Sequence, residues 1–121
     1  MNDFQLRLKS VMDDYVNLVY EITKNFPKQE IYGSISQFRR SSLSVILNYI
    51  EGYARQKSLI RLNFLEISYG SLMESDYLLE FSKKQSFMPD NDYNKCKKYT
   101  KEIGAMLWTE ISNLKNSLKN N

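Results

Sequence analysis

The chain of 121 residues lacks histidine altogether and has a single cysteine, Cys96. Without histidine, the most common general base and the most common metal ligand of proteins are missing. One cysteine cannot form an intrachain disulfide, which suits a reducing compartment. The lysines beside Cys96 favour a lowered thiol pKa. Because no histidine can partner that thiol, we expect no catalytic cysteine. We also expect no bound metal and no cofactor.

Turn-forming residues are scarce as well, with four glycines and two prolines. An all-β fold needs many tight turns, so this scarcity disfavours one. No run of about 18 uncharged apolar residues occurs, and no segment is therefore expected to span a membrane. Acidic residues lie among the apolar ones near the N-terminus, which is not the pattern of a signal peptide. We expect a cytoplasmic protein.

The composition fits one globular domain over residues 1–121, with 42% hydrophobic residues for a core. Seventeen basic and fourteen acidic residues leave a net charge of +3. This mild excess does not by itself mark a nucleic-acid binder. The chain carries no phosphate-binding loop, dinucleotide fingerprint or zinc spacing.

Apolar residues at spacings of three and four predict four helices, at about 4–24, 29–55, 58–86 and 92–118. Pro27 ends the first helix, Ser58 is the expected N-cap of the third, and Pro89 with Asp90 starts the fourth. Short connections between long helices predict an all-α fold, an antiparallel up-down-up-down four-helix bundle. Small residues within these helices, Gly52 and the pair Gly70–Ser71, indicate close approach of a neighbouring helix.

Polar residues beside the apolar stripes suggest an interior polar layer. Asn48 and Glu51 share one face of the second helix, and Ser71 and Glu74 one face of the third. Two glutamates without histidine are too few for the usual di-metal bundle site. We therefore favour a hydrogen-bonded layer that sets the register, with Arg39 or Arg40 neutralising a glutamate. A carboxylate enzyme or metal site on Glu51 and Glu74 is the less favoured alternative.

Basic residues gather at both ends of the predicted bundle. These clusters are candidate nucleic-acid contacts, although a lysine-rich face is more often only solvated. Most aromatic residues fall on the apolar stripes, which favours a core role over base stacking. The candidate nucleic-acid-binding residues are Arg40, Arg55, Lys57, Arg61, Lys95, Lys97, Lys98 and Lys101.

Four motifs in one order resemble a known family. They are FPKQE-x-x-G from Phe26, SQFRRSSLSV from Ser36, N-x-x-EG from Asn48 and FL-x-I-x-x-GSLME from Phe64. Together they resemble the 23S ribosomal RNA intervening-sequence proteins, also called four helix bundle proteins, over about residues 4 to 118. The resemblance implies a left-handed antiparallel bundle that assembles into a homopentamer. A related branch, the accessory variability determinant of diversity-generating retroelements, binds a reverse transcriptase and nucleic acid.

Three functions follow as hypotheses. The first is a non-enzymatic, oligomeric bundle that binds or scaffolds RNA or DNA or a nucleoprotein partner, for example a reverse transcriptase. The second is a structural or protein-interaction module without a nucleic-acid role. The third, a carboxylate enzyme or metal protein, has the least support. Salt-dependent RNA binding would separate the first from the second.

Overall fold

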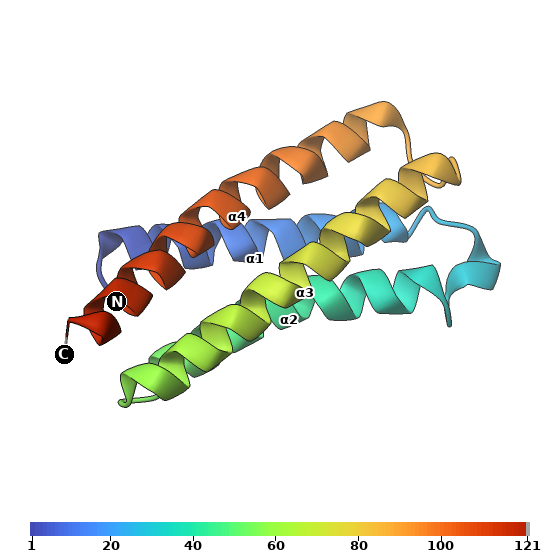
Figure 1. The fold of residues 1–121 in the computed structure, drawn as a ribbon. Helices are drawn as coiled ribbons and strands as arrows, with labels where there is room; N and C mark the ends of the chain where they lie inside the picture. Colours follow the sequence, from blue (N-terminus) through green and yellow to red (C-terminus); the bar gives the residue numbers. More distant parts are fainter. Residues whose placement is uncertain (121) are drawn as a thin grey trace.

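The computed structural model describes residues 1–120, and within them the chain is all helical (Figure 1). Four long helices are joined by short connections, which confirms the four-helix bundle. A short 3-10 helix, η1 (Lys28–Glu30), follows the first of them. The four long helices are α1 (Asp3–Thr23), α2 (Ser34–Tyr53), α3 (Ser58–Lys84) and α4 (Asp90–Lys119).

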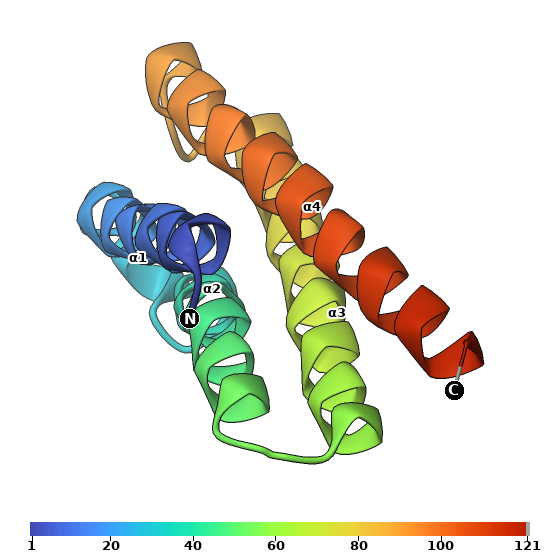
Figure 2. The ribbon, with the colours of Figure 1, turned by 90° about the vertical axis from the view of Figure 1, so that its left-hand side faces the viewer.

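Each helix packs against the two that neighbour it around the bundle. Helix α2 packs along α1 and α3, and α4 packs along the same two helices, whereas within residues 1–120 the backbones of α2 and α4 do not come close to each other and only side chains join them. Helices α2 and α4 therefore occupy diagonal corners, as the end-on view shows (Figure 2). The outward faces of these two helices consequently point in opposite directions.

The core consists of apolar stripes on the four helices, although the predicted second stripe of α2 stays largely exposed at Leu43, Leu47 and Ile50. Its largest fully buried side chains include Tyr15 on α1, Phe38 and Tyr49 on α2, Leu72 on α3 and Leu107 on α4. Each helix is amphipathic and stabilised mainly by burying one stripe against its neighbours. None of the helices in the described part of the chain is long and apolar enough to cross a membrane.

Two helix starts and one N-cap differ from the sequence-based expectation. The predicted start of the second helix at residue 29 is wrong, because Gly33 leaves helical geometry and α2 begins at Ser34. Ser58 is not an N-cap, because Lys57 holds that position without a side-chain cap bond. Helix α4 begins at Asp90, two residues earlier than expected, and Asp90 and Asp92 in its first turn suit the positive end of the helix dipole.

The ends of α2 and α3 also lie earlier than predicted, at Tyr53 and Lys84. After α3, Ser86 takes a positive φ of 61° and the Phe87 N–H donates to the Ser82 carbonyl at 2.9 Å. Such a left-handed residue closes the helix by satisfying its last carbonyls. This local chemistry ends α3 two residues before the end of its periodic pattern.

The predicted close approach at Gly52 is confirmed. A Cβ atom there would lie 3.2 Å from the Phe64 Cβ and 3.4 Å from the Arg61 carbonyl, so α2 and α3 touch at this glycine. Ser71 also meets α2, since its hydroxyl bonds the Ser44 hydroxyl at 2.8 Å. Gly70 differs, because a Cβ added there would meet nothing within 4 Å.

Candidate nucleic-acid interface

The outer face of α4 carries a line of lysines that we call the α4 stripe. Its members follow one another at alternating intervals of three and four residues, the spacing of a single helix face. Six of the seven are exposed and Ser112 is half-buried, while Ile103 and Leu107 on the opposite face lie in the core. The α4 stripe consists of Lys98, Lys101, Ala105, Trp108, Ser112, Lys115 and Lys119.

The α4 stripe contains four positive charges and no acidic residue. Lys115 approaches Glu66 of α3 at 3.7 Å, but both side chains are about half exposed. Such an exposed pair is weak in water, about 0–1 kcal/mol. The stripe therefore carries two lysines at each end, with uncharged residues between them, on the corner of the bundle diagonal to α2.

Four of the predicted nucleic-acid-binding lysines lie in the first half of α4, and their side chains do not all point the same way. Lys98 and Lys101 belong to the α4 stripe. Lys95 points to the α1 side, where with Lys98 it lines a groove of about 750 Å³ between α1 and α4. Lys97 turns toward α3. Adjacent residues of a helix point about 100° apart, which is why this run does not form one patch.

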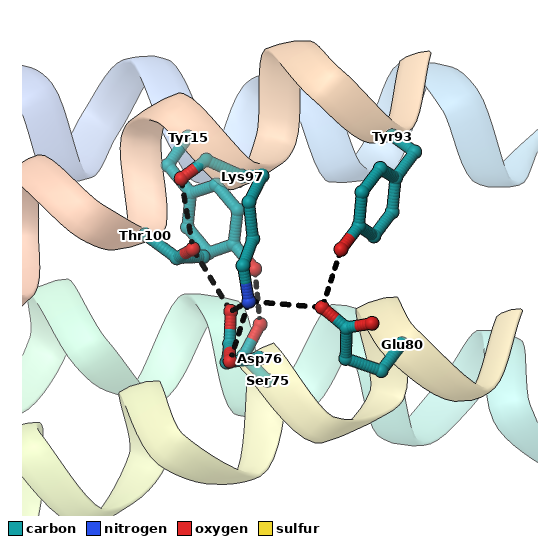
Figure 3. A network of polar contacts seen from close by, with 7 residues as sticks. All are labelled: Tyr15, Ser75, Asp76, Glu80, Tyr93, Lys97 and Thr100. Carbon is teal, nitrogen blue, oxygen red and sulfur yellow. Dashed lines mark hydrogen bonds and ion pairs between the residues drawn. The ribbon is translucent and has the colours of Figure 1, made fainter. Parts of the chain in front are cut away.

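Lys97 belongs to a polar network that joins α3 to α4 (Figure 3). Its ammonium donates to Asp76 at 2.9 Å and to Glu80 at 2.9 Å. Tyr93 donates to the same Glu80 at 2.5 Å, and Thr100 donates to Asp76 at 2.9 Å. Desolvation opposes the charged form, but the bonds to Glu80 and Asp76 prevail and raise the pKa of Lys97 to about 12. Lys97 is thus a structural cation, neutralised within the chain.

The basic junction of α2 and α3 is largely structural too. Arg61 donates to the carbonyls of Gly52 at 3.3 Å and Arg55 at 3.0 Å, and its guanidinium lies over the Tyr53 ring. These bonds add to the pairing of carbonyls at and just after the end of α2. Arg55 pairs with Glu51 one turn earlier.

Two other predicted contacts are exposed. Lys57 lies in the turn before α3, and Arg40 lies on the outer side of α2. Neither is on α4, so neither belongs to the α4 stripe. The structure therefore does not bring the eight predicted basic residues together.

The predicted interior polar layer does not form within one chain. Asn48 donates to the Ser44 carbonyl one turn before it, and Glu51 pairs with Arg55 on its own helix. Glu74 is exposed. Of the expected members, only Ser71 bonds across to α2. The interpretation fails because these residues lie on the outer edge of the α2–α3 contact.

Arg39 also differs from expectation, since it neutralises no glutamate. Its Nε donates to the Thr23 hydroxyl at 2.8 Å, and its guanidinium lies 4.9 Å from the centre of the Tyr20 ring. Arg39 therefore fastens the start of α2 to the end of α1.

A buried carboxyl that sequence reasoning missed lies at the other end of α4. Glu110 is only 9% exposed, and both of its oxygens accept hydrogen bonds, from the hydroxyls of Tyr49 and Tyr53. Gln5 extends the network by donating to Tyr53 at 3.0 Å. Burial raises the pKa of Glu110 above its usual range, against the effect of its hydrogen bonds.

This environment predicts a stability change with pH. A carboxyl with a raised folded pKa contributes stability that is complete below its unfolded pKa, near 4.5, and is lost as pH rises through the folded value. Thermal unfolding of the parent and of Glu110→Gln should therefore show the parent losing stability relative to the variant above about pH 4.5. Equal pH profiles for the two proteins would contradict this assignment.

Glu80 supplies a control, because its contribution to stability should depend on pH in the opposite direction to that of Glu110. The bond from Tyr93, followed by that from Lys97, lowers the pKa of Glu80. Its stabilisation is present above the unfolded pKa and is lost as pH falls through the folded value. The parent should accordingly lose stability relative to Glu80→Gln in acid, whereas the Glu110 effect appears as the pH rises.

Reactive or metal-binding chemistry finds little support in the geometry. Within residues 1–120, no three side chains among cysteines, aspartates and glutamates are grouped so that they could hold a metal ion. Cys96 is fully buried, and burial together with Asp92 raises its thiol pKa to about 12. The lowered pKa expected from the flanking lysines is wrong, because both lysines point away from the core position of the thiol.

Comparisons with known proteins agree with this fold. A family model for the 23S rRNA-intervening sequence proteins matches residues 5–109. No curated protein matches the chain. A solved structure of a protein of unknown function from the S23 ribosomal protein family of Bacteroides thetaiotaomicron has a TM-score of 0.77 and 21% identity, covering 86% of this chain and 97% of its own. The chain belongs to the family of 23S rRNA-intervening sequence proteins.

Proposed function

We propose that this protein is a non-enzymatic, self-associating bundle that binds RNA through the outer face of α4. The observation that carries the proposal is the α4 stripe, which presents four lysines and no acid along one helix face. Lysines arranged in this way attract phosphates, and on binding they displace the counterions that surround the nucleic acid. The family name supports an RNA context, although it states no activity.

Self-association is supported by an exposed apolar surface at the opposite corner, which we call the α2 patch. It consists of Leu43, Leu47 and Ile50 on α2 with Ile60 and Ile67 on α3, each between 37% and 53% exposed. Five exposed apolar side chains on two neighbouring helices are the kind of surface that suits an interaction site. The spacing of 43, 47 and 50 suits packing against another helix.

A homo-oligomer built through the α2 patch would leave every α4 stripe in solvent, because α2 and α4 lie on diagonal corners (Figure 2). Five copies, the number that the family resemblance implies, would carry about +15. Such a charge concentrates polyanions near the assembly at low salt. Repeated weak sites on one assembly also strengthen binding by avidity.

A protein-interaction role is the second candidate. Tyr32, in the turn between η1 and α2, is 95% exposed and follows the half-exposed Ile31. An apolar pair on a turn suits a protein contact, and a reverse transcriptase is the partner that the family resemblance implies. This surface is separate from the α4 stripe, so one assembly has room for both partners.

The test is a titration of the protein into labelled structured RNA, followed by fluorescence anisotropy at low and near-physiological salt. Four lysine contacts per chain should give a log–log salt slope of roughly −3 or steeper. A protein that binds no RNA even at low salt would contradict the proposal and favour the protein-interaction role.

A further inference from the structure

We infer that the α4 stripe is a site for single-stranded RNA, in which Trp108 stacks on an unpaired base between lysines that hold the flanking phosphates. This inference rests on the proposed function and names the form of RNA that the same site takes. The nucleic-acid class follows from three features: the exposed indole, the spacing of the lysines and the lack of acids.

Trp108 is the chain's sole tryptophan, and it is 54% exposed on the outer side of α4. A large apolar ring in that position gains little from folding, since much of its surface remains in water. Tyr69 of α3 packs against it with 5.5 Å between ring centroids and 50° between ring planes. This contact holds the indole in place, which lowers the entropy that a ligand must overcome on binding.

The lysines lie at regular distances on both sides of Trp108. Lys101 precedes it by seven residues and Lys115 follows by seven, so each lies two helical turns, or about 10 Å, from the indole along α4. Lys98 and Lys119 extend the line to about 31 Å. The stripe residues between them, Ala105 and Ser112, are small and leave the indole accessible from both directions.

The nearest acids do not cancel this line. Glu66 meets only Lys115, at 3.7 Å, and Glu102 is held by Arg7 at 2.7 Å on the α1 side. Asp76 and Glu80 are neutralised in part by Lys97. The surface around Trp108 therefore complements a polyanion and does not suit a basic partner.

The exposed indole favours single strands over duplexes. Paired bases are already stacked on one another, and side chains cannot read the deep, narrow major groove of duplex RNA. An unpaired base offers a free face, and stacking on an aromatic side chain tolerates any sequence. A duplex would contact only the lysines, while a single strand would use the lysines and Trp108 together.

In the parent, the fluorescence of Trp108 reports on this site alone because the chain has no other tryptophan. The Trp108 variants lack that reporter, so affinities of the parent and of all variants are compared by the fluorescence anisotropy of end-labelled RNA. The parent is titrated with a short uridine homopolymer and, separately, with the same polymer annealed to its adenosine complement. The single strand should quench the emission, and Trp108→Ala should weaken its binding roughly 5- to 150-fold. Trp108→Phe should retain part of the affinity, and duplex binding should change less than threefold in both variants.

Tyr77→Ala is the matched control, because Tyr77 is 67% exposed on α3 and lies outside the α4 stripe. It should bind the single strand like the parent, and circular dichroism should show all variants equally helical. If Trp108→Ala binds the single strand as well as the parent does, the stacking site is refuted while RNA binding by the lysines stands. If neither RNA form binds at low salt, the proposed function and this inference both fail. If the single strand quenches the Trp108 emission while the protein also loses its self-association, Trp108 lies at a subunit contact and the inference is overturned.

Discussion

Reversing the four lysines of the α4 stripe to glutamate should lower the affinity for structured RNA by at least about 100-fold and reduce the log–log salt slope by about 3. Each lysine that contacts a phosphate releases counterions, so its loss appears in the slope as well as in the affinity. The four side chains lie on the outer face of α4, away from the core. We therefore expect the variant to fold and to melt close to the parent temperature.

A control variant separates a local site from general attraction. Reversing Lys9, Lys24, Lys28 and Lys84 changes the net charge by the same amount, from +3 to −5, but leaves α4 untouched. This control should bind RNA within about tenfold of the parent, since it loses long-range attraction only. Equal losses in the two variants would mean that α4 has no special role. Lys97 is left unchanged in both proteins, because its removal would leave Asp76 and Glu80 without their cation.

Replacing Leu43, Leu47 and Ile50 by glutamine should convert the assembly to monomers. Burying such a side chain fully is worth about 1.5–3 kcal/mol, and about half of each is already buried in the single chain. The interface would then weaken by about 2–4 kcal/mol, roughly 30- to 700-fold. Glutamine is a good helix former, so α2 itself should persist.

Sedimentation velocity measures this effect directly. The matched control replaces Leu59, Met73 and Tyr77, three exposed side chains outside the α2 patch, by glutamine and should keep the parent mass. RNA affinity should also fall in the monomeric variant, since avidity is lost although every stripe is intact. A triple variant that sediments like the parent would show that the α2 patch is not the subunit contact.

The fold could be predicted from the sequence because its strongest signals are periodic and local. Val45 and Leu72 fall on stripes of three and four, and both are fully buried. Gly52 had no local reason to stand within a helix, and the contact with Phe64 accounts for it. The start of α2 was mispredicted because Ile31 and Ile35 continue the helical spacing across η1, although Gly33 interrupts the backbone.

The site was harder to predict, because closeness in the sequence differs from closeness on a helix. Lys95, Lys97 and Lys98 are nearly consecutive, yet Lys95 and Lys98 line the groove between α1 and α4 whereas Lys97 turns toward α3. Trp108 and Lys115 were overlooked because they lie one and two heptads beyond Lys101, where no local cluster marks them. Counting intervals of three and four residues along the helix from Lys98 onward would have identified both residues.

Buried polar partners could not be inferred from one helix at a time. Glu110 looks like a solvated residue of a polar helix, and its burial depends on Tyr49 and Tyr53 of α2. The bond of 2.5 Å between Tyr15 and Ser75 likewise joins helices whose relative rotation no local pattern specifies. Such pairs appear only once the bundle is assembled.

Ultraviolet crosslinking of the protein to RNA, with the linked peptides identified by mass spectrometry, would locate the RNA site on the bundle. We expect the crosslinked peptides to come from α4, with Trp108 among the linked residues. Crosslinks concentrated on α2 or on the turn at Tyr32, with none on α4, would contradict this expectation.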